Sequence, residues 1–444
     1  MRITDEEKKT ALDALDCALS FGASAAKVCL NKSVLSTYSV LDKEFDKLVH
    51  SSDRSLYFSI FADGRYGNFS TNRFDMPELK DFLKSSIETV RMFAPDDARS
   101  LPDPELYYKG RTDGCEMGTD DPGFDFVAPE RKKQIALECA CAVTEPTVSS
   151  ETEFSDQEDG ALYADTQGFT GLAYETTYAV TSEITVKGKG HSRASGYYWR
   201  SSPMLENLKY DDCALKALER AKARLAPKKI RSGKYAAVIE NTVSSRLFAP
   251  IIMALNGTAI QQHNSFLTGS MGKQIFPEWL SVTDRPHVKG APGARLFDSE
   301  GVATGDCDII RNGTVGMYFI NSYASHKLGM PQTVESPSRP GIIPFNRVSD
   351  TAGTREKILR DIGSGILVTG FNGGNSNPVT GAFSFGIEGF RFENGEILYP
   401  VSEMLVTGDI LSLWAKSLFA GDDPVQGTRW QIPTLAFDDV DFNG

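Results

Sequence analysis

The spacing of apolar residues predicts four helices in the first half of the chain. Residues 5–21 repeat apolar positions at intervals of three and four, the period of a helix with one buried face. The same spacing returns at 76–93, 129–143 and 210–225. Pro77 suits the first turn of the second segment, where its missing N–H costs nothing. We therefore expect four amphipathic helices before residue 226.

Between these helices the pattern changes to alternation with a period of two, which is typical of half-buried strands. Residues 25–72 contain three such runs, AKVCL, SVLSTYSVLDKEFDKLV and SLYFSIFADGRYGNFST. The pair Asp63-Gly64 inside the last run predicts a hairpin. Further alternating runs lie between 147 and 202. Helices next to antiparallel strands predict an α+β layer.

The second half is predicted to consist mostly of strands. A run at 235–241 opens it, and from residue 278 onward short alternating runs are separated by turn signals. Two of these signals are Asn-Gly pairs, at 312–313 and 394–395, which favour tight antiparallel hairpins. The expected fold class is therefore α+β, with an N-terminal helix and antiparallel-sheet half and a β-rich C-terminal half.

The chain is expected to form two domains, because 444 residues exceed the usual size of a single core. The basic, turn-prone segment PKKIRSGKY indicates a boundary near residue 228. This gives an N-terminal α+β region at 1–228 and a β-rich domain at 229–444. Residues 94–128 are rich in Pro, Gly and Asp and have no period, so they are expected to be a long connection within the first region.

Charge and composition argue against a nucleic-acid partner, a membrane span and secretion. The chain has 47 basic and 59 acidic residues, a net charge of −12, which disfavours binding to nucleic acid because phosphates are repelled. No apolar run approaches 18 residues, and no basic segment with an apolar stretch opens the chain, so neither a membrane span nor a secretion signal is expected. Seven scattered cysteines favour reduced thiols, and a cytoplasmic location is expected.

The common motifs of hydrolases are missing from the sequence. None of the five histidines is followed by Glu and no two lie within five residues, so the histidine pair of a zincin-type protease is absent. No G-x-S-x-G elbow occurs either. The glycine cluster at 370–381 follows a predicted strand, and it suits either close approach to a ligand or a simple hairpin connection. His263 follows an apolar run, where a surface histidine is the simpler interpretation.

Four segments together resemble the TldD/PmbA family, known as modulators of DNA gyrase and viewed as peptide-processing metalloproteases. The likeness is strongest in NSFLTGSMGK at 264–273, and it continues at 63–72, 306–330 and 365–411. The last segment contains N-x-x-T-G-x-F-S at residues 377–384. The resemblance implies an α+β N-terminal half and a β-rich C-terminal half.

The same resemblance implies that this chain lacks the metal site of its relatives. In this family the catalytic subunit, TldD, carries H-E-x-x-x-H on the helix before NSFLTGSMGK, and a cysteine near the C-terminus completes the zinc site. Counted back from that anchor, Phe248, Ala249 and Met253 stand at the three motif positions, and no cysteine follows Cys307. We interpret the replacements as packing residues. No catalytic residue and no metal ligand is therefore expected in this chain.

The implied branch is PmbA (TldE), the non-metal partner of TldD. The expected activity is shared: a heterodimer with a TldD-type paralogue, which holds the zinc, processes or degrades unfolded, extended peptides. Residues expected to contact the peptide are His263, Asn264, Asn375, Thr380 and Gly381. Two alternatives stay open, a self-sufficient peptidase that uses residues such as His263, and a non-proteolytic regulator acting through DNA gyrase or its inhibitors. A homodimer is expected in isolation.

Overall fold

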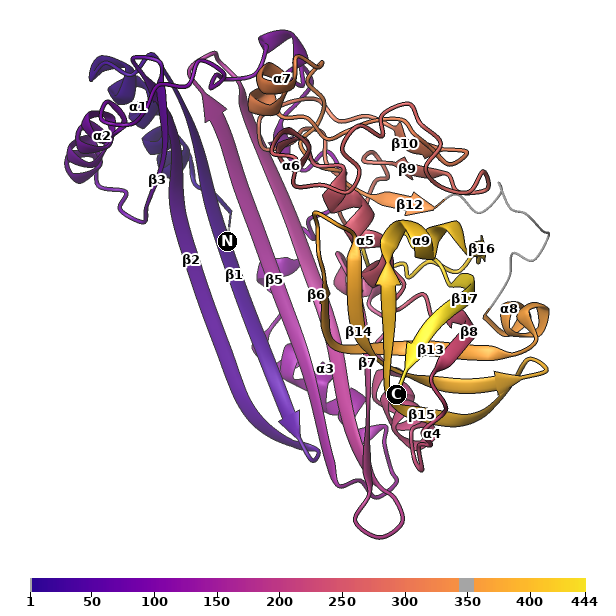
Figure 1. The fold of residues 1–444 in the computed structure, drawn as a ribbon. Helices are drawn as coiled ribbons and strands as arrows, with labels where there is room; N and C mark the ends of the chain where they lie inside the picture. The colour runs from indigo at the N-terminus through magenta and orange to yellow at the C-terminus, as the bar shows by residue number, and fades with distance from the viewer. Residues whose placement is uncertain (1, 343–354) are drawn as a thin grey trace.

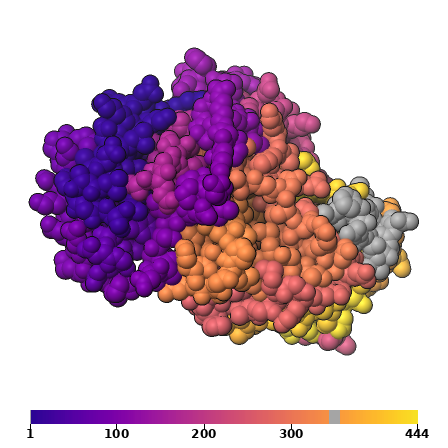
Figure 2. Space-filling view, turned by 90° about the horizontal axis from the view of Figure 1, so that it is seen from above, coloured from indigo at the N-terminus to yellow at the C-terminus, as the bar shows by residue number. Residues whose placement is uncertain are grey.

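The structure is a computed structural model that describes residues 2–342 and 355–444. A large sheet of long strands forms the N-terminal part, and two smaller sheets with short helices form the C-terminal part (Figure 1). Figure 2 shows the two parts side by side, in contact along a broad boundary. The predicted α+β class, with a β-rich C-terminal half, is confirmed.

The large sheet has seven strands in the order β3-β2-β1-β5-β6-β4, and β7 also pairs with β6. Alternate residues of β1, β5 and β6 are buried, as the period-two pattern predicts. The expected turn at Asp63-Gly64 joins β2 to β3, and both residues have positive φ. The strands are β1 (Ala25–Leu41), β2 (Glu44–Ala62), β3 (Arg65–Thr71), β4 (Asp113–Gly114), β5 (Ser149–Asp165), β6 (Thr170–Lys187) and β7 (Arg193–Ser202).

The three runs expected at 25–72 are divided differently in the structure. A turn at Asp42 and Lys43, with φ of 49° and 70°, splits the middle run, so that two strands of 17 and 19 residues form. Neither turn residue is Gly, so the sequence pattern gave no sign of a turn at this point. A correction therefore applies to the strand boundaries, whereas the antiparallel pairing is as expected.

The four predicted helices cover one face of the large sheet. Figure 1 shows α3 behind the strands. Helices α1 and α2 pack on β1 and β2, whereas α3 packs on β5 and α4 on β6 and β7. The helices are α1 (Asp5–Ser20), α2 (Met76–Val90), α3 (Pro129–Cys141) and α4 (Cys213–Ala223). The connection at 94–128 is largely irregular and holds β4 and the short 3₁₀ helices η1 (Pro104–Leu106) and η2 (Phe124–Phe126); η3 (Leu205–Asn207) follows β7.

In the C-terminal part, one sheet closes on itself. Its order is β15-β14-β13-β8-β17-β16, and the additional pairing of β15 with β17 completes a ring. The parallel pairing of β8 with β13 was not expected from the antiparallel hairpin pattern. The strands of this sheet are β8 (Gly233–Ile239), β13 (Gly365–Ser376), β14 (Ala382–Glu393), β15 (Glu396–Asp409), β16 (Ser417–Ala420) and β17 (Leu435–Asn443).

Among residues 229–342 and 355–444, a four-stranded sheet and five helices complete the C-terminal part. Both Asn-Gly pairs form the expected turns, one between β10 and β11 and the other between β14 and β15. The strands are β9 (Val282–Asp284), β10 (Cys307–Arg311), β11 (Thr314–Val315) and β12 (Pro340–Ile342). The helices are α5 (Ser245–Ala254), α6 (Gly257–Gln261), α7 (Ser322–Leu328), α8 (Arg355–Ile362) and α9 (Ile410–Ala415). Among the described residues, no helix is long and apolar enough to cross a membrane.

Candidate functional site

Helix α5 carries the three positions where the resemblance implies a metal motif. Phe248 is fully buried, and its ring makes edge contacts with Trp414 and Trp430, with centroids 6.0 and 6.2 Å away. Ala249 is half-buried, whereas Met253 is 63% exposed. The interpretation as packing residues is therefore correct for Phe248 and wrong for Met253.

Hydrogen bonds fix α5 at both ends. Trp414 donates its indole N–H to Leu247 O (3.1 Å), which ties the start of the helix to α9. At the other end the Ser265 hydroxyl donates to Ala254 O at 2.5 Å and accepts from Leu267 N. This second contact holds the following loop against the last turn of α5. The loop that carries His263 and Asn264 is thereby positioned by the helix.

A second loop, between β13 and β14, meets the first beside α5. Phe266 N donates to Pro378 O (3.3 Å), which joins the two loops directly. Arg246 at the start of α5 donates from Nη2 to Gly374 O (3.1 Å). The side-chain amide oxygen of Asn377 accepts hydrogen bonds from the backbone N–H groups of Val379 and Thr380, which stabilises the turn. The two glycine- and asparagine-rich loops therefore form one surface with α5.

The structure brings the predicted peptide-binding residues onto these two loops and the end of β13. His263 and Asn264 are exposed on the first loop, Thr380 is exposed on the second, and Asn375 is exposed near the end of β13. Gly381 is buried at the base of the second loop. Four of the five side chains can therefore reach a ligand from solvent, and peptide binding by these residues stays a prediction.

Gly381 has a conformational role in its loop. Its φ is +78°, and a Cβ there would lie 2.9 Å from Asp409 Oδ2. Its N–H donates to Asn377 O (2.8 Å), and its carbonyl accepts from Ile410 N (2.9 Å). Only glycine adopts this positive φ and leaves room for the Asp409 carboxylate without strain.

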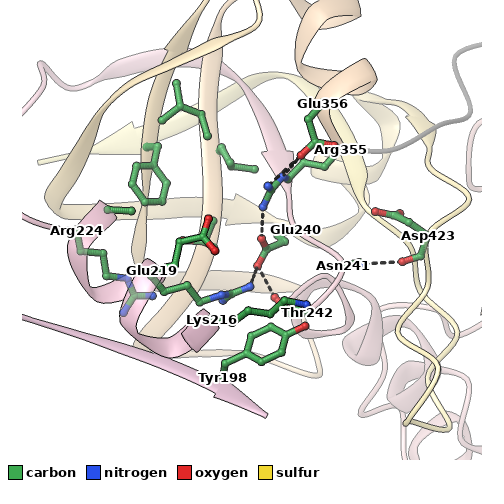
Figure 3. Close-up of a pocket in the computed structure, with 16 residues that line it drawn as sticks. Tyr198, Lys216, Glu219, Arg224, Glu240, Asn241, Thr242, Arg355, Glu356 and Asp423 are labelled. Atoms are coloured by element: carbon green, nitrogen blue, oxygen red, sulfur yellow. Dashed lines mark hydrogen bonds and ion pairs between the residues drawn. The ribbon is translucent and has the colours of Figure 1, made fainter. Parts of the chain in front are cut away.

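A cavity of about 430 Å³ lies between α4 and the C-terminal sheet (Figure 3). Buried Glu240 sits at its centre and accepts hydrogen bonds from Arg220 Nη2 and Arg355 Nη1, both at 2.6 Å. Thr242 donates its hydroxyl to the same carboxylate (2.5 Å). Sequence reasoning missed this cluster because Arg220 and Arg355 lie 20 and 115 residues away from Glu240. The cluster joins α4 to β8 and α8.

A larger cleft of about 780 Å³ separates the open, polar face of the large sheet from the C-terminal part. Its sheet wall includes Glu175, and its opposite wall includes Arg295 and Arg429. Burial raises the pKa of Glu175. Burial, together with the nearby Arg295 guanidinium, lowers the pKa of Arg429. The cleft thus has Asp159 and Glu175 on its sheet wall, and both guanidinium and carboxylate groups, among them Arg295, Arg429 and Asp298, on the opposite wall.

Buried polar groups hold the far wall of this cleft in place. Arg295 donates from Nε to Ser338 Oγ (2.7 Å) and from Nη2 to Ser336 O (2.6 Å). Asp298 is 1% exposed and accepts from the backbone N–H of Val302 (3.0 Å) and of residues 300 and 335. Burial, with a further contribution from neighbouring carboxylates, raises the pKa of Asp298 to about 6. These bonds make the wall a preformed surface.

Comparisons with known proteins agree with this geometry. A family model of the PmbA/TldA metallopeptidase C-terminal domain matches residues 232–444. The crystal structure of a candidate modulator of DNA gyrase from Bacteroides thetaiotaomicron is 40% identical and superposes with a TM-score of 0.93, with 100% of both chains covered. The chain belongs to the PmbA/TldD family. The resemblance stated from the sequence is confirmed.

Other PmbA/TldD relatives match along nearly the whole chain. The Metalloprotease PmbA of Escherichia coli O157:H7 is 27% identical, with 95% of this chain and 92% of the relative covered. TldE from Thermococcus kodakarensis is 17% identical and covers 98% of this chain and 100% of its own, with a TM-score of 0.80, so the two share the fold. The family is thus one of metalloproteases.

For a PmbA/TldD protein, the residues on α5 do not fit a zinc ion. Zinc in proteins is held by thiolate, imidazole and carboxylate groups. Residues 241–262 contain none of these, and a thioether such as that of Met253 prefers softer metals. Across residues 2–342 and 355–444, no group of three or more His, Cys, Asp or Glu is placed to hold a metal. The described residues therefore support no metal-dependent chemical step on this chain.

Proposed function

We propose that this chain is the non-metal subunit of a TldD/TldE-type metallopeptidase that processes or degrades unfolded peptides. The observation that carries the proposal is the burial of Phe248 between two tryptophans at the first motif position of α5. A side chain in that environment is closed off from water, so it cannot bind a catalytic zinc ion that must also bind a water molecule. The rest of the family fold is kept over the full length of the chain. The zinc of the complex is held by a TldD-type paralogue.

The cleft beside the large sheet supports a role in substrate binding. Extended peptides bind through backbone hydrogen bonds, with specificity from pockets for alternate side chains. A polar cleft of about 780 Å³ has room for several residues of such a peptide. We further propose that His263, Asn264, Asn375 and Thr380 contact the peptide from their loops, and that Gly381 shapes the second loop.

Co-expression with a TldD-type paralogue from the same genome tests the proposal. We expect the two chains to elute together in size-exclusion chromatography and to cleave an unstructured peptide, whereas this chain alone cleaves nothing. Replacing either motif histidine of the paralogue, or removing zinc with a chelator, should abolish cleavage without separating the chains. Within this chain, His263→Ala should raise KM, whereas His191→Ala, which changes an exposed loop of the N-terminal part, should not.

The alternatives give different results in the same experiment. Peptide cleavage by the isolated chain, with stoichiometric zinc lost on mutating His263, would establish a self-sufficient peptidase and end the proposal. Separate elution of the two chains, with no cleavage by the mixture, would also refute it. Retention of this chain by DNA gyrase subunits under those conditions would then favour a non-proteolytic regulator.

A further inference from the structure

Two guanidinium groups on the wall of the larger cleft opposite the sheet form no ion pair with a described carboxylate. The Arg295 guanidinium is bonded only to neutral serine groups: Nε donates to Ser338 Oγ (2.7 Å), and Nη2 donates to Ser336 O (2.6 Å). Arg429 makes no hydrogen bond and no ion pair through its side chain with any residue that the structure describes, and it is exposed. Both arginines line the cleft.

Packing against Gly293 places Arg429 beside Arg295. Gly293 has a φ of +79°, and a Cβ there would lie 2.7 Å from Arg429 Cβ and 3.6 Å from its Cδ, so the Arg429 side chain lies against the Gly293 backbone. The same Cβ would lie 2.6 Å from the carbonyl oxygen of Ser338, whose hydroxyl binds Arg295. Burial and the neighbouring Arg295 guanidinium lower the pKa of Arg429. Two like charges are therefore held near each other on this wall.

The loop that carries Arg429 is fixed on both sides. The carbonyl of Gly427 accepts a hydrogen bond from Ser201 Oγ on β7 (2.7 Å), which ties the loop to the large sheet. Gln431 makes two backbone hydrogen bonds to β12, at 2.9 and 3.2 Å. A ligand in the cleft would therefore meet donors that are already in place, and such preorganisation lowers the entropy lost on binding.

The neighbouring carboxylates do not pair with these guanidinium groups. Asp284 is 1% exposed and accepts hydrogen bonds from two backbone N–H groups, at 2.8 and 2.5 Å. Asp298 accepts from three backbone N–H groups, and Glu335 accepts from one (3.2 Å). Glu175, on the sheet wall, makes no ion pair with a described residue. The two arginines thus face the cleft without an ion-pair partner among the described residues.

We propose that Arg295 and Arg429 bind a carboxylate group of the substrate peptide. The fork of N–H donors on a guanidinium matches the two oxygens of a carboxylate, and such charge-assisted hydrogen bonds are stronger than neutral ones. Nη1 of Arg295 and the whole Arg429 guanidinium have no partner among the described residues, so both can donate. A carboxylate between them also offsets the repulsion of two like charges. This inference rests on the proposed role of the cleft in peptide binding.

A peptide offers this carboxylate from two sources, an Asp or Glu side chain and its own C-terminus. Four forms of one short, unstructured peptide of Ala, Ser and Gly separate the sources: its central residue is Glu or Gln, and its C-terminus is free or amidated. The cleft lies within this chain, so the dissociation constant of each form is measured on the full-length chain alone, by isothermal titration calorimetry. We expect the form whose carboxylate binds the arginines to bind about tenfold more tightly than its neutral counterpart.

Substitutions in the cleft test the two arginines directly. Arg429→Gln should weaken binding of the preferred form by about tenfold and remove its advantage over the neutral form. Arg429→Lys keeps the charge but loses the fork, so its dissociation constant should lie between those of the wild type and Arg429→Gln. Glu175→Gln removes a negative charge from the facing wall and should tighten binding of the same form.

Arg193→Gln is the matched control. Arg193 is exposed at the start of β7, does not line the cleft and makes no ion pair with the described residues. This substitution removes the same charge from the chain, so it should leave all four dissociation constants unchanged. Circular dichroism of each variant shows whether the fold is retained.

The inference fails if the wild-type chain binds all four peptide forms equally or binds none of them. It also fails if Arg429→Gln weakens the fully neutral form as much as the carboxylate forms, because the change would then come from the shape of the cleft and not from its charge. Cleavage by the complex with a TldD-type paralogue is measured separately. Absence of cleavage would refute the proposed peptidase function, whereas absence of carboxylate preference would refute only this site.

Discussion

Phe248→Ala tests whether α5 is a structural helix in this chain. The Phe248 side chain is fully buried and contacts Trp414 and Trp430. A buried phenylalanine removes about 200 Å² of apolar surface from water, which at about 25 cal/mol per Å² stabilises the fold by about 5 kcal/mol. Alanine retains part of this burial, and the cavity can partly collapse. We therefore expect the free energy of unfolding to fall by about 3–5 kcal/mol.

Met253→Ala is the matched control, because it shortens another large apolar side chain on the same helix. Met253 is 63% exposed, so its loss should change the free energy of unfolding by about 0.5 kcal/mol or less. Urea denaturation followed by tryptophan fluorescence suits the comparison, since two tryptophans contact Phe248. Equal effects of the two substitutions, or a Phe248→Ala variant as stable as the wild type, would refute the assignment of α5 to the core.

Three further substitutions have defined outcomes. Burial alone would raise the pKa of Glu7, but a backbone hydrogen bond and two cationic side chains lower it from 4.5 to about 2. Its stabilisation is therefore present above pH 4.5 and lost as the pH falls toward 2, so Glu7→Gln should cost about 3 kcal/mol in urea titrations at neutral pH. The difference in unfolding free energy between wild type and Glu7→Gln should shrink below about pH 4. Glu6 is exposed, so Glu6→Gln should leave the unfolding free energy unchanged both at neutral pH and below about pH 4. Glu240→Gln removes the carboxylate charge between Arg220 and Arg355, although Arg355 keeps its ion pair with Glu356. The variant should lower the unfolding free energy by about 3 kcal/mol, measured by thermal and urea unfolding; an unchanged midpoint would contradict a stabilising role. Gly381→Ala adds a steric contact to a positive φ and should lose about 1–3 kcal/mol in the same assay, more than Gly373→Ala, where the φ is similar and nothing lies within 4 Å.

Local signals in the sequence were sufficient for the helices of the N-terminal part and for the glycine-containing turns. The helices on the large sheet follow the period of their apolar residues, because each buries one stripe. The turn at Asp42 and Lys43 was missed because neither residue carries the glycine that marks a tight turn. The parallel pairing of β8 with β13 was also missed, since the paired residues are more than a hundred positions apart and no local pattern links them.

The exposure of Met253 on α5 did not follow from its apolar character. Phe248 and Met253 are five residues apart, so they lie about 140° apart around a helix axis. The buried face of α5 is broad and also contains Leu247 and Ile252, which are five residues apart, and the structure buries Phe248 and exposes Met253. Apolar character alone led to the wrong interpretation for Met253. By contrast, nothing in the sequence indicated that Arg220 and Arg355 would meet at Glu240, because that contact depends on the packing of α4 and α8 against β8.

The burial of Phe248 limits what this chain can contribute to a metallopeptidase. An imidazole at that position would be closed off from water beside two indole rings, and a buried polar group without a partner costs about 1–3 kcal/mol. In the proposed complex, this chain therefore contributes the shape of the cleft and the binding of a partner rather than a zinc ligand. One wall of this cleft includes Asp53 and Tyr57 of β2.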